Sequence, residues 1–146
     1  MEVKLVVNGI EVELGGYDEV HDVCFSLVDH KKNRPVFDEL AKSPSSQIRE
    51  TIAGHDSISD ETVVRLLGDP SVNVIRMMVD NDRSERLMTD DIFDQLVANR
   101  DSEVLSSLAS HVGDYSRCDI EKACGKLRSE GHAAMVGGFV YSCVIL

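Results

Sequence analysis

The stretch Ile48-Arg49-Glu50-Thr51-Ile52-Ala53 recurs 27 residues later as Ile75-Arg76-Met77-Met78-Val79-Asp80. A weaker copy, Val104-Leu105-Ser106-Ser107-Leu108-Ala109, follows after a further 29 residues. Each copy places apolar residues four positions apart, which is the spacing of one face of an α-helix. The chain therefore repeats a short helix at an interval typical of repeat proteins, in which no single unit buries its own apolar face.

A second helix is expected in each unit. The run from Ser59 to Leu67 resembles the run from Thr89 to Val97. Each begins with a hydroxyl residue suited to cap a helix, and acids follow it near the positive end of the helix dipole. Turn-forming residues at 43–45, 68–71 and 99–102 separate the helices. With further helices at 20–28, 35–41 and 120–127, the pattern predicts about three and a half to four paired-helix units.

Residues 35–112 resemble the leucine-rich-repeat-variant and HEAT-like α-helical repeat families. The second unit keeps most of the pattern but has Asp80 where Ala is usual, and the third unit lacks the arginine. The resemblance implies a mainly α fold, a right-handed solenoid of short helices whose concave surface binds protein partners. The residues that carry the resemblance best are Arg49, Ile52, Ala53, Leu66, Leu67, Asp69 and Pro70, followed by Arg76, Val79, Asn81 and Leu96.

The N-terminal segment 1–16 has the pattern of a β-hairpin. Asn8-Gly9 suits a two-residue turn between two β-prone runs, which predicts that Val7 faces Ile10 and Leu5 faces Val12. The C-terminal segment 133–146 is also rich in β-formers. We expect it to add a third strand to the hairpin or to pack against it, with the repeats occupying 17–132. An alternative is that the hairpin or the C-terminal strand pairs two copies of the chain into a homodimer.

Composition excludes several classes of protein. The chain has 146 residues, 42% of them hydrophobic, and 26 acids against 15 Lys and Arg give a net charge of −11. That length suits one domain, and the charge argues against a nucleic-acid binder. No apolar run reaches the ~20 residues that span a membrane, and the start lacks the pattern of a signal peptide. The sequence thus predicts a cytoplasmic protein with no membrane partner.

Three arginines, Arg49, Arg65 and Arg76, recur near the repeat period and are the candidate partner-binding residues. A row of guanidinium groups could grip an acidic peptide or phosphate. The alternative is that each arginine bonds a neighbouring helix end or an acid of its own repeat. Residues 46–101 hold twelve acids and six Lys or Arg, so a partner steered by charge is expected to be basic there.

Metal and catalytic motifs are weak. The stretch Asp80-Asn81-Asp82, with Ser84 and Asp91, offers oxygen ligands for calcium, but Glu85 stands where a calcium loop needs glycine. His55 and His111 come after the first helix of their units, which is the position expected from repetition rather than from a ligand pair.

Nucleophile motifs are missing, although Cys24 could meet His21 or His30 in space. The tail Cys143-Val144-Ile145-Leu146 matches a prenylation pattern, but no basic segment precedes it. We therefore expect no metal site, no cofactor and no catalytic residue. The sequence favours a non-enzymatic protein-interaction module or scaffold, with a metal-binding or hydrolytic regulator that uses assembled His, Asp and Cys as the alternative.

Overall fold

A computed structural model describes residues 4–7, 9–13, 16–132, 134–136 and 139–141. Within these residues the protein is mainly helical, which confirms the expected class at that coarse level. No helix among them is long and apolar enough to cross a membrane. The helices are α1 (Tyr17–Ser26), α2 (Arg34–Leu40), α3 (Ser46–Ala53), α4 (Asp60–Leu67), α5 (Val72–Val79), α6 (Asp90–Ala98), α7 (Ser102–His111) and α8 (Ile120–Ser129), with short 3-10 helices η1 (Lys31–Asn33), η2 (Asp82–Ser84) and η3 (Val112–Asp114).

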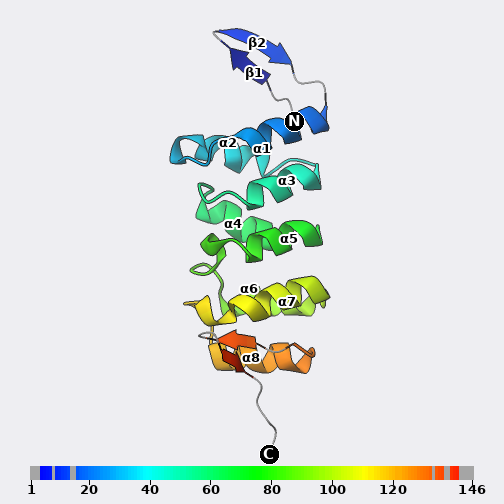
Figure 1. The fold of residues 1–146 in the computed structure, drawn as a ribbon, viewed down its shortest axis with the longest axis vertical. Helices are drawn as coiled ribbons and strands as arrows, with labels where there is room; N and C mark the ends of the chain where they lie inside the picture. The colour runs from blue at the N-terminus through cyan, green and yellow to red at the C-terminus, as the bar shows by residue number, and fades with distance from the viewer. Residues whose placement is uncertain (1–3, 8, 14–15, 133, 137–138, 142–146) are drawn as a thin grey trace, which may run out of the picture.

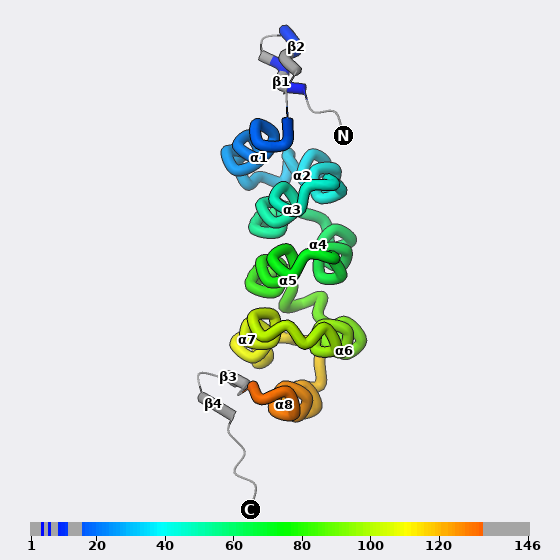
Figure 2. The backbone as a smooth tube through the Cα atoms, turned by 90° about the vertical axis from the view of Figure 1, so that its right-hand side faces the viewer, coloured from blue at the N-terminus to red at the C-terminus, as the bar shows by residue number. Residues whose placement is uncertain are grey.

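The helices lie in chain order along the long axis, from α1 near one end to α8 near the other (Figure 1). Turned by 90°, they separate into two layers (Figure 2). The odd-helix layer consists of α1, α3, α5 and α7, and the even-helix layer consists of α2, α4, α6 and α8. Each odd helix contacts the next one. The three copies of the repeated stretch, which begin at Ile48, Ile75 and Val104, thus lie side by side on α3, α5 and α7.

The helix starts follow the capping residues expected from the sequence. The Ser59 side chain accepts a hydrogen bond from the backbone N–H of Thr62, and the Thr89 side chain accepts one from Ile92. These contacts confirm the two predicted N-caps. Each cap satisfies a backbone donor that would otherwise lack a partner at the first turn.

The core runs continuously between the two layers. Every helix contributes buried apolar side chains at helical spacing, and together they form one cluster. Burying one such side chain fully contributes roughly 1.5–3 kcal/mol, so successive units stabilise one another through their shared face. The largest fully buried side chains are Tyr115, Phe37, Phe93, Ile48, Ile52, Ile58, Leu66, Met78, Met88, Leu108, Leu127 and Val63.

Polar side chains also link one unit to the next. The carboxylate of Asp29 accepts hydrogen bonds from the backbone N–H groups of Asp56 and Ser57, at 2.7 and 2.9 Å. The amide of Asn81 donates to the carbonyl of Ala53, which lies 28 residues earlier. Since these bonds span about one repeat, they hold neighbouring units in register.

At the N-terminal end, β1 (Lys4–Val7) and β2 (Ile10–Glu13) pair antiparallel. Between them Gly9 has φ +82°, a conformation that suits glycine. The Ile10 side chain is 69% exposed, so no other described element covers it. The register pairs Lys4 with Glu13, Leu5 with Val12, Val6 with Glu11 and Val7 with Ile10.

The described residues of the C-terminal segment, 134–136 and 139–141, do not join these strands, whereas we expected a third strand or packing against them. Strand β3 (Ala134–Val136) pairs antiparallel with β4 (Phe139–Tyr141) in a separate sheet. It lies against α7, α8 and η3, at the opposite end of the molecule from β1 and β2 (Figure 1). The reason is the length of the stack, because all the helices stand between the two termini. The tail 142–146, with its prenylation pattern, lies outside the described residues.

Candidate functional site

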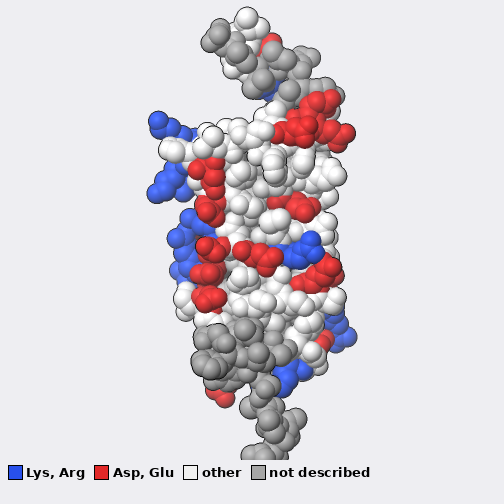
Figure 3. Space-filling view, viewed as in Figure 1, with Lys and Arg blue, Asp and Glu red and all other residues white. Residues whose placement is uncertain are grey.

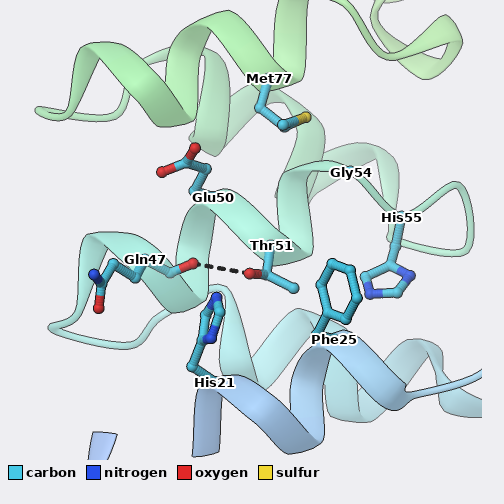
Figure 4. A pocket seen from close by; sticks show the side chains of 8 residues that line it. All are labelled: His21, Phe25, Gln47, Glu50, Thr51, Gly54, His55 and Met77. Atoms are coloured by element: carbon cyan, nitrogen blue, oxygen red, sulfur yellow. Dashed lines mark hydrogen bonds between the residues drawn. The ribbon is translucent and has the colours of Figure 1, made fainter. Parts of the chain in front are cut away.

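A groove of about 540 Å³ crosses the outer surface of the odd-helix layer. Its side chains come from α1, α3 and α5 and from the turn after α3 (Figure 4). In this view Phe25 and His21 project from α1 toward α3, and Met77 approaches from α5. The lining residues are His21, Phe25, Gln47, Glu50, Thr51, Gly54, His55 and Met77.

Helical spacing explains why these side chains face outward. On α1 the buried side is formed by Val20 and Cys24, which leaves His21 and Phe25, four residues apart, on the adjacent face of the helix. Phe25 is 77% exposed. The ring therefore presents apolar surface to solvent at the groove.

The turn after α3 keeps the groove open between α3 and α5. A Cβ atom added at Gly54 would lie 3.4 Å from the carbonyl oxygen of Thr51 and 3.7 Å from the sulfur of Met77. A larger side chain at this position would therefore fill the space in front of Met77.

The imidazole of His55 is held by two contacts behind the groove. It stacks on the ring of Phe37, with centroids 4.4 Å apart and planes inclined by 17°. Its Nδ1 atom lies 4.0 Å from a carboxylate oxygen of Asp29. The equivalent residue His111 lies with its Nε2 atom 3.5 Å from Asp80. Both histidines thus lie near an aspartate just after the preceding odd helix.

The surface beside the groove is acidic. Asp18, Glu19 and Asp22 are exposed on α1, and Glu50 lines the groove on α3. Neither helix carries a lysine, and the arginine on α3 is bonded to Asp69 instead. Among the described residues no ion pair with Lys or Arg is formed by these four acids, so the surface beside the groove favours basic ligands.

Basic side chains gather elsewhere, along one edge of the molecule next to a line of acids (Figure 3). A second hollow, of about 400 Å³, is lined by basic side chains. It lies at residues of η1, η2 and the turn after α3. Acids also reach into it, and Asp60 pairs with both Arg83 and Arg86. The hollow is therefore partly neutralised within the chain. Its lining residues are Lys31, Arg34, Asp56, Ser57, Asp82, Arg83 and Arg86.

The three candidate arginines lie on three different helices and are all engaged within the chain. Arg49 binds Asp69 through two hydrogen bonds. Arg65, on the even-helix layer, donates to the backbone carbonyl of Asp38 at 3.4 Å. Arg76 pairs with Glu103 on the neighbouring α7. The arrangement matches the intramolecular alternative, and contact of these arginines with a partner stays a prediction.

The structure separates most of the other candidate ligands. In the proposed calcium stretch, Asn81 is bonded to Ala53, and the buried Ser84 hydroxyl donates to the carbonyl of Val79. Cys24 is fully buried, and this burial raises the pKa of its thiol. A reactive cysteine needs the opposite shift, so the burial of Cys24 argues against its use as a nucleophile with His21.

One group of side chains in the described part of the chain could hold a metal ion. Glu85, His111 and Asp114 place one ligand atom each within 4.8 Å of one another. The sequence interpretation assigned His111 to repeat architecture and missed both acids. The spacing of His111 and Asp114, three residues apart, was an available signal, but Glu85 lies 26 residues from His111 and only the fold brings it there.

No family model matches this chain, and no curated protein or solved structure matches it. Its function must therefore be argued from the groove, the charges around it and the side-chain clusters themselves.

Proposed function

We propose that this chain is a protein-binding module of HEAT-like helical repeats. Its groove on α1, α3 and α5 would take a basic segment of a partner that carries an apolar anchor. The observation that carries this proposal is the exposed ring of Phe25 at the groove, 77% accessible and set opposite Met77. Aromatic side chains and methionines are enriched where proteins bind one another.

The repeated geometry supports the assignment to HEAT-like repeats. Copies of one short helix lie side by side in the odd-helix layer, and polar links of about one repeat length join the units. Such an arrangement supplies an extended surface made of several helices. Extended surfaces of this kind are used by repeat proteins to bind partners.

The dimensions and lining of the groove support a peptide ligand. A volume of about 540 Å³ accommodates one or two large side chains of a partner. Gln47, Glu50 and Thr51 lie along it and offer hydrogen-bonding groups for a backbone or a polar side chain. An apolar anchor between Phe25 and Met77 with polar contacts beside it follows the usual organisation of a binding hot spot.

The charge supports a basic partner. Glu50 lies in the groove and Asp18, Glu19 and Asp22 lie on the adjoining helix. Lys or Arg residues that flank the apolar anchor would find acidic partners there. An acidic or phosphorylated segment would be repelled.

A selection from a random peptide library on the full chain tests the proposal. We expect enriched peptides to contain an aromatic or aliphatic residue flanked by Lys or Arg. Phe25→Ala and Glu50→Lys should each weaken binding of a selected peptide at least tenfold in fluorescence anisotropy. The matched controls are Val36→Ala and Val64→Ala, which remove exposed apolar side chains from the even-helix layer and should leave binding unchanged.

Three outcomes would overturn the proposal. The first is enrichment of acidic peptides, and the second is equal affinity for the wild type and Phe25→Ala. The third is a selection that enriches no peptide at all. Circular dichroism of each variant ensures that a loss of binding is not a loss of folding.

A further inference from the structure

A second site lies away from the groove, where the chain leaves α5 and α7. Glu85 follows η2, His111 is the last residue of α7, and Asp114 ends η3. One ligand atom of each lies within 4.8 Å of the other two. A third acid, Asp80, places a carboxylate oxygen 3.5 Å from the Nε2 atom of His111. Small side-chain rotations would bring the three ligand atoms onto one ion, since metal–ligand bonds are about 2.0–2.2 Å long.

In the described part of the chain, the two carboxylates of this cluster, Glu85 and Asp114, have no Lys or Arg partner in an ion pair. The adjoining C-terminal segment 133–146 contains no Lys, Arg or His that could supply one. The nearby Arg83 and Arg86 pair with Asp60 instead. The carboxyl end of α7 adds partial negative charge, which also favours a cation.

A buried polar group next to the cluster lacks a partner. Tyr115, which follows Asp114, is 1% exposed, and in the described structure its hydroxyl has no hydrogen-bond partner. Buried polar groups without a partner are rare, and a water molecule beside the cluster would offer one.

We propose that Glu85, His111 and Asp114 bind one divalent transition-metal ion of the zinc class. Imidazole together with two carboxylates suits such ions, whereas calcium and magnesium prefer oxygen ligands alone. Three protein ligands leave a further position for water. Asp80 then acts as a positioning residue that orients the His111 imidazole.

The bound ion would join two consecutive units. Glu85 belongs to the connection between α5 and α6, while His111 ends α7 and Asp114 ends η3 directly after it. Binding would therefore stabilise the stack at this point, because an ion bound only by the folded protein shifts the equilibrium away from unfolding. This role is independent of the peptide groove, whose residues lie on α1, α3 and α5.

The test is a titration of the full, tag-free chain with zinc after removal of metal, in competition with a chromophoric chelator. We expect one equivalent to bind and the melting temperature to rise. Glu85→Gln and Asp114→Asn, which keep the side-chain shape, should each lower the affinity at least tenfold. Asp80→Asn should lower it about tenfold or more, as is usual for groups that orient a ligand. His132→Gln and Asp56→Asn are the controls that should leave binding unchanged.

Cobalt(II) as a second probe identifies the ligands. We expect visible absorption that disappears in His111→Gln and contains no sulfur-to-metal charge-transfer band. Such a band would place the ion on a cysteine and overturn the assignment. Absence of stoichiometric zinc binding, equal binding by wild type and Glu85→Gln, or calcium binding as tight as zinc binding would also overturn it.

Discussion

Arg49 and Asp69 form a two-pronged ion pair that is almost excluded from solvent. The Nε atom of Arg49 lies 2.7 Å from one carboxylate oxygen of Asp69, and Nη2 lies 2.9 Å from the other. The two side chains are 12% and 6% exposed. The remaining Nη1 group donates to the carbonyls of Ser43 and Pro44. One guanidinium therefore joins the turn after α2, helix α3 and the turn after α4.

Replacing one partner of this pair should destabilise the protein strongly. Asp69→Asn leaves the Arg49 charge buried without an anion, which typically costs about 3–5 kcal/mol of unfolding free energy. Arg49→Lys keeps the charge but loses the two-pronged geometry, so it should also destabilise. Urea unfolding measures both changes. The control is Arg76→Lys at an exposed pair, where the loss should stay below about 1 kcal/mol. Equal losses at the two pairs would contradict the structural assignment.

Acid should weaken the links between units. Although burial opposes the shift, hydrogen bonds from Ser57 and Asp56 hold the pKa of Asp29 below its usual value. Asp38 has the same pattern, with Ser59 and Thr62 as donors, and its pKa is also lowered. A carboxylate with a lowered pKa in the folded state stabilises the protein above its unfolded pKa of about 3.9. This contribution disappears as pH falls through the lower folded pKa.

The corresponding measurement is urea unfolding between pH 7 and pH 3. Asp29→Asn and Asp38→Asn should be less stable than the wild type at pH 7, and the difference should shrink below about pH 4. Asp90, whose pKa is lowered by the backbone N–H of Asp119, should behave in the same direction. Its neighbour Asp91, exposed on the same helix, is the matched control. If the difference in unfolding free energy between wild type and variant did not change with pH, the lowered pKa of these carboxylates in the folded state would be refuted.

Ser59 and Ser71 should contribute differently to the unfolding free energy, although each directly precedes a helix. Ser59 accepts a hydrogen bond from the N–H of Thr62, whereas the Ser71 side chain caps no backbone donor of α5. Ser59→Ala should therefore lower the unfolding free energy by about 1 kcal/mol. Ser71→Ala should change it much less. Thermal unfolding of the two variants measures both losses of stability. Equal losses would mean that the capping hydrogen bond of Ser59 does not stabilise the protein.

The described cysteines should react slowly with thiol reagents. Cys24 and Cys124 are buried, and burial with the charges of Asp90 and Asp94 raises the pKa of Cys118 to about 11. In a Cys143→Ser background, the reaction of Cys118 with DTNB should still accelerate at pH 10. An unstructured cysteine peptide should level off near its ordinary pKa of about 8.5. A plateau at that pH in the folded protein would show that Cys118 is not shielded.

Local patterns predicted most of the helical elements. The apolar spacing at Ile48 and Ile52, the hydroxyl caps at Ser59 and Thr89, and the breaks near Pro44 and Pro70 all depend on residues a few positions apart. Local backbone and side-chain energetics act over that range, so a sequence read alone can reveal them. The boundaries of the first helix shifted, because the expected run at 20–28 lies at 17–26 in the structure.

Local patterns did not predict how the strands of the C-terminal segment pair. Its β-formers indicated strands, and in its described residues β3 pairs with the adjacent β4 and not with the N-terminal strands. No local pattern within 133–146 indicates how far this segment lies from the N-terminal strands. That distance depends on the stacking of all the helices between them.

The sequence by itself determined which side chains are apolar and where several of the helices begin, because these properties arise from neighbours within a few turns. Only the tertiary structure decided that Glu85 meets His111 and Asp114, and that Phe25 and Met77 line one groove. Those residues are separated by 26 or more positions. Their proximity results from packing between units, in which the burial of many side chains at once sets the position of each polar group.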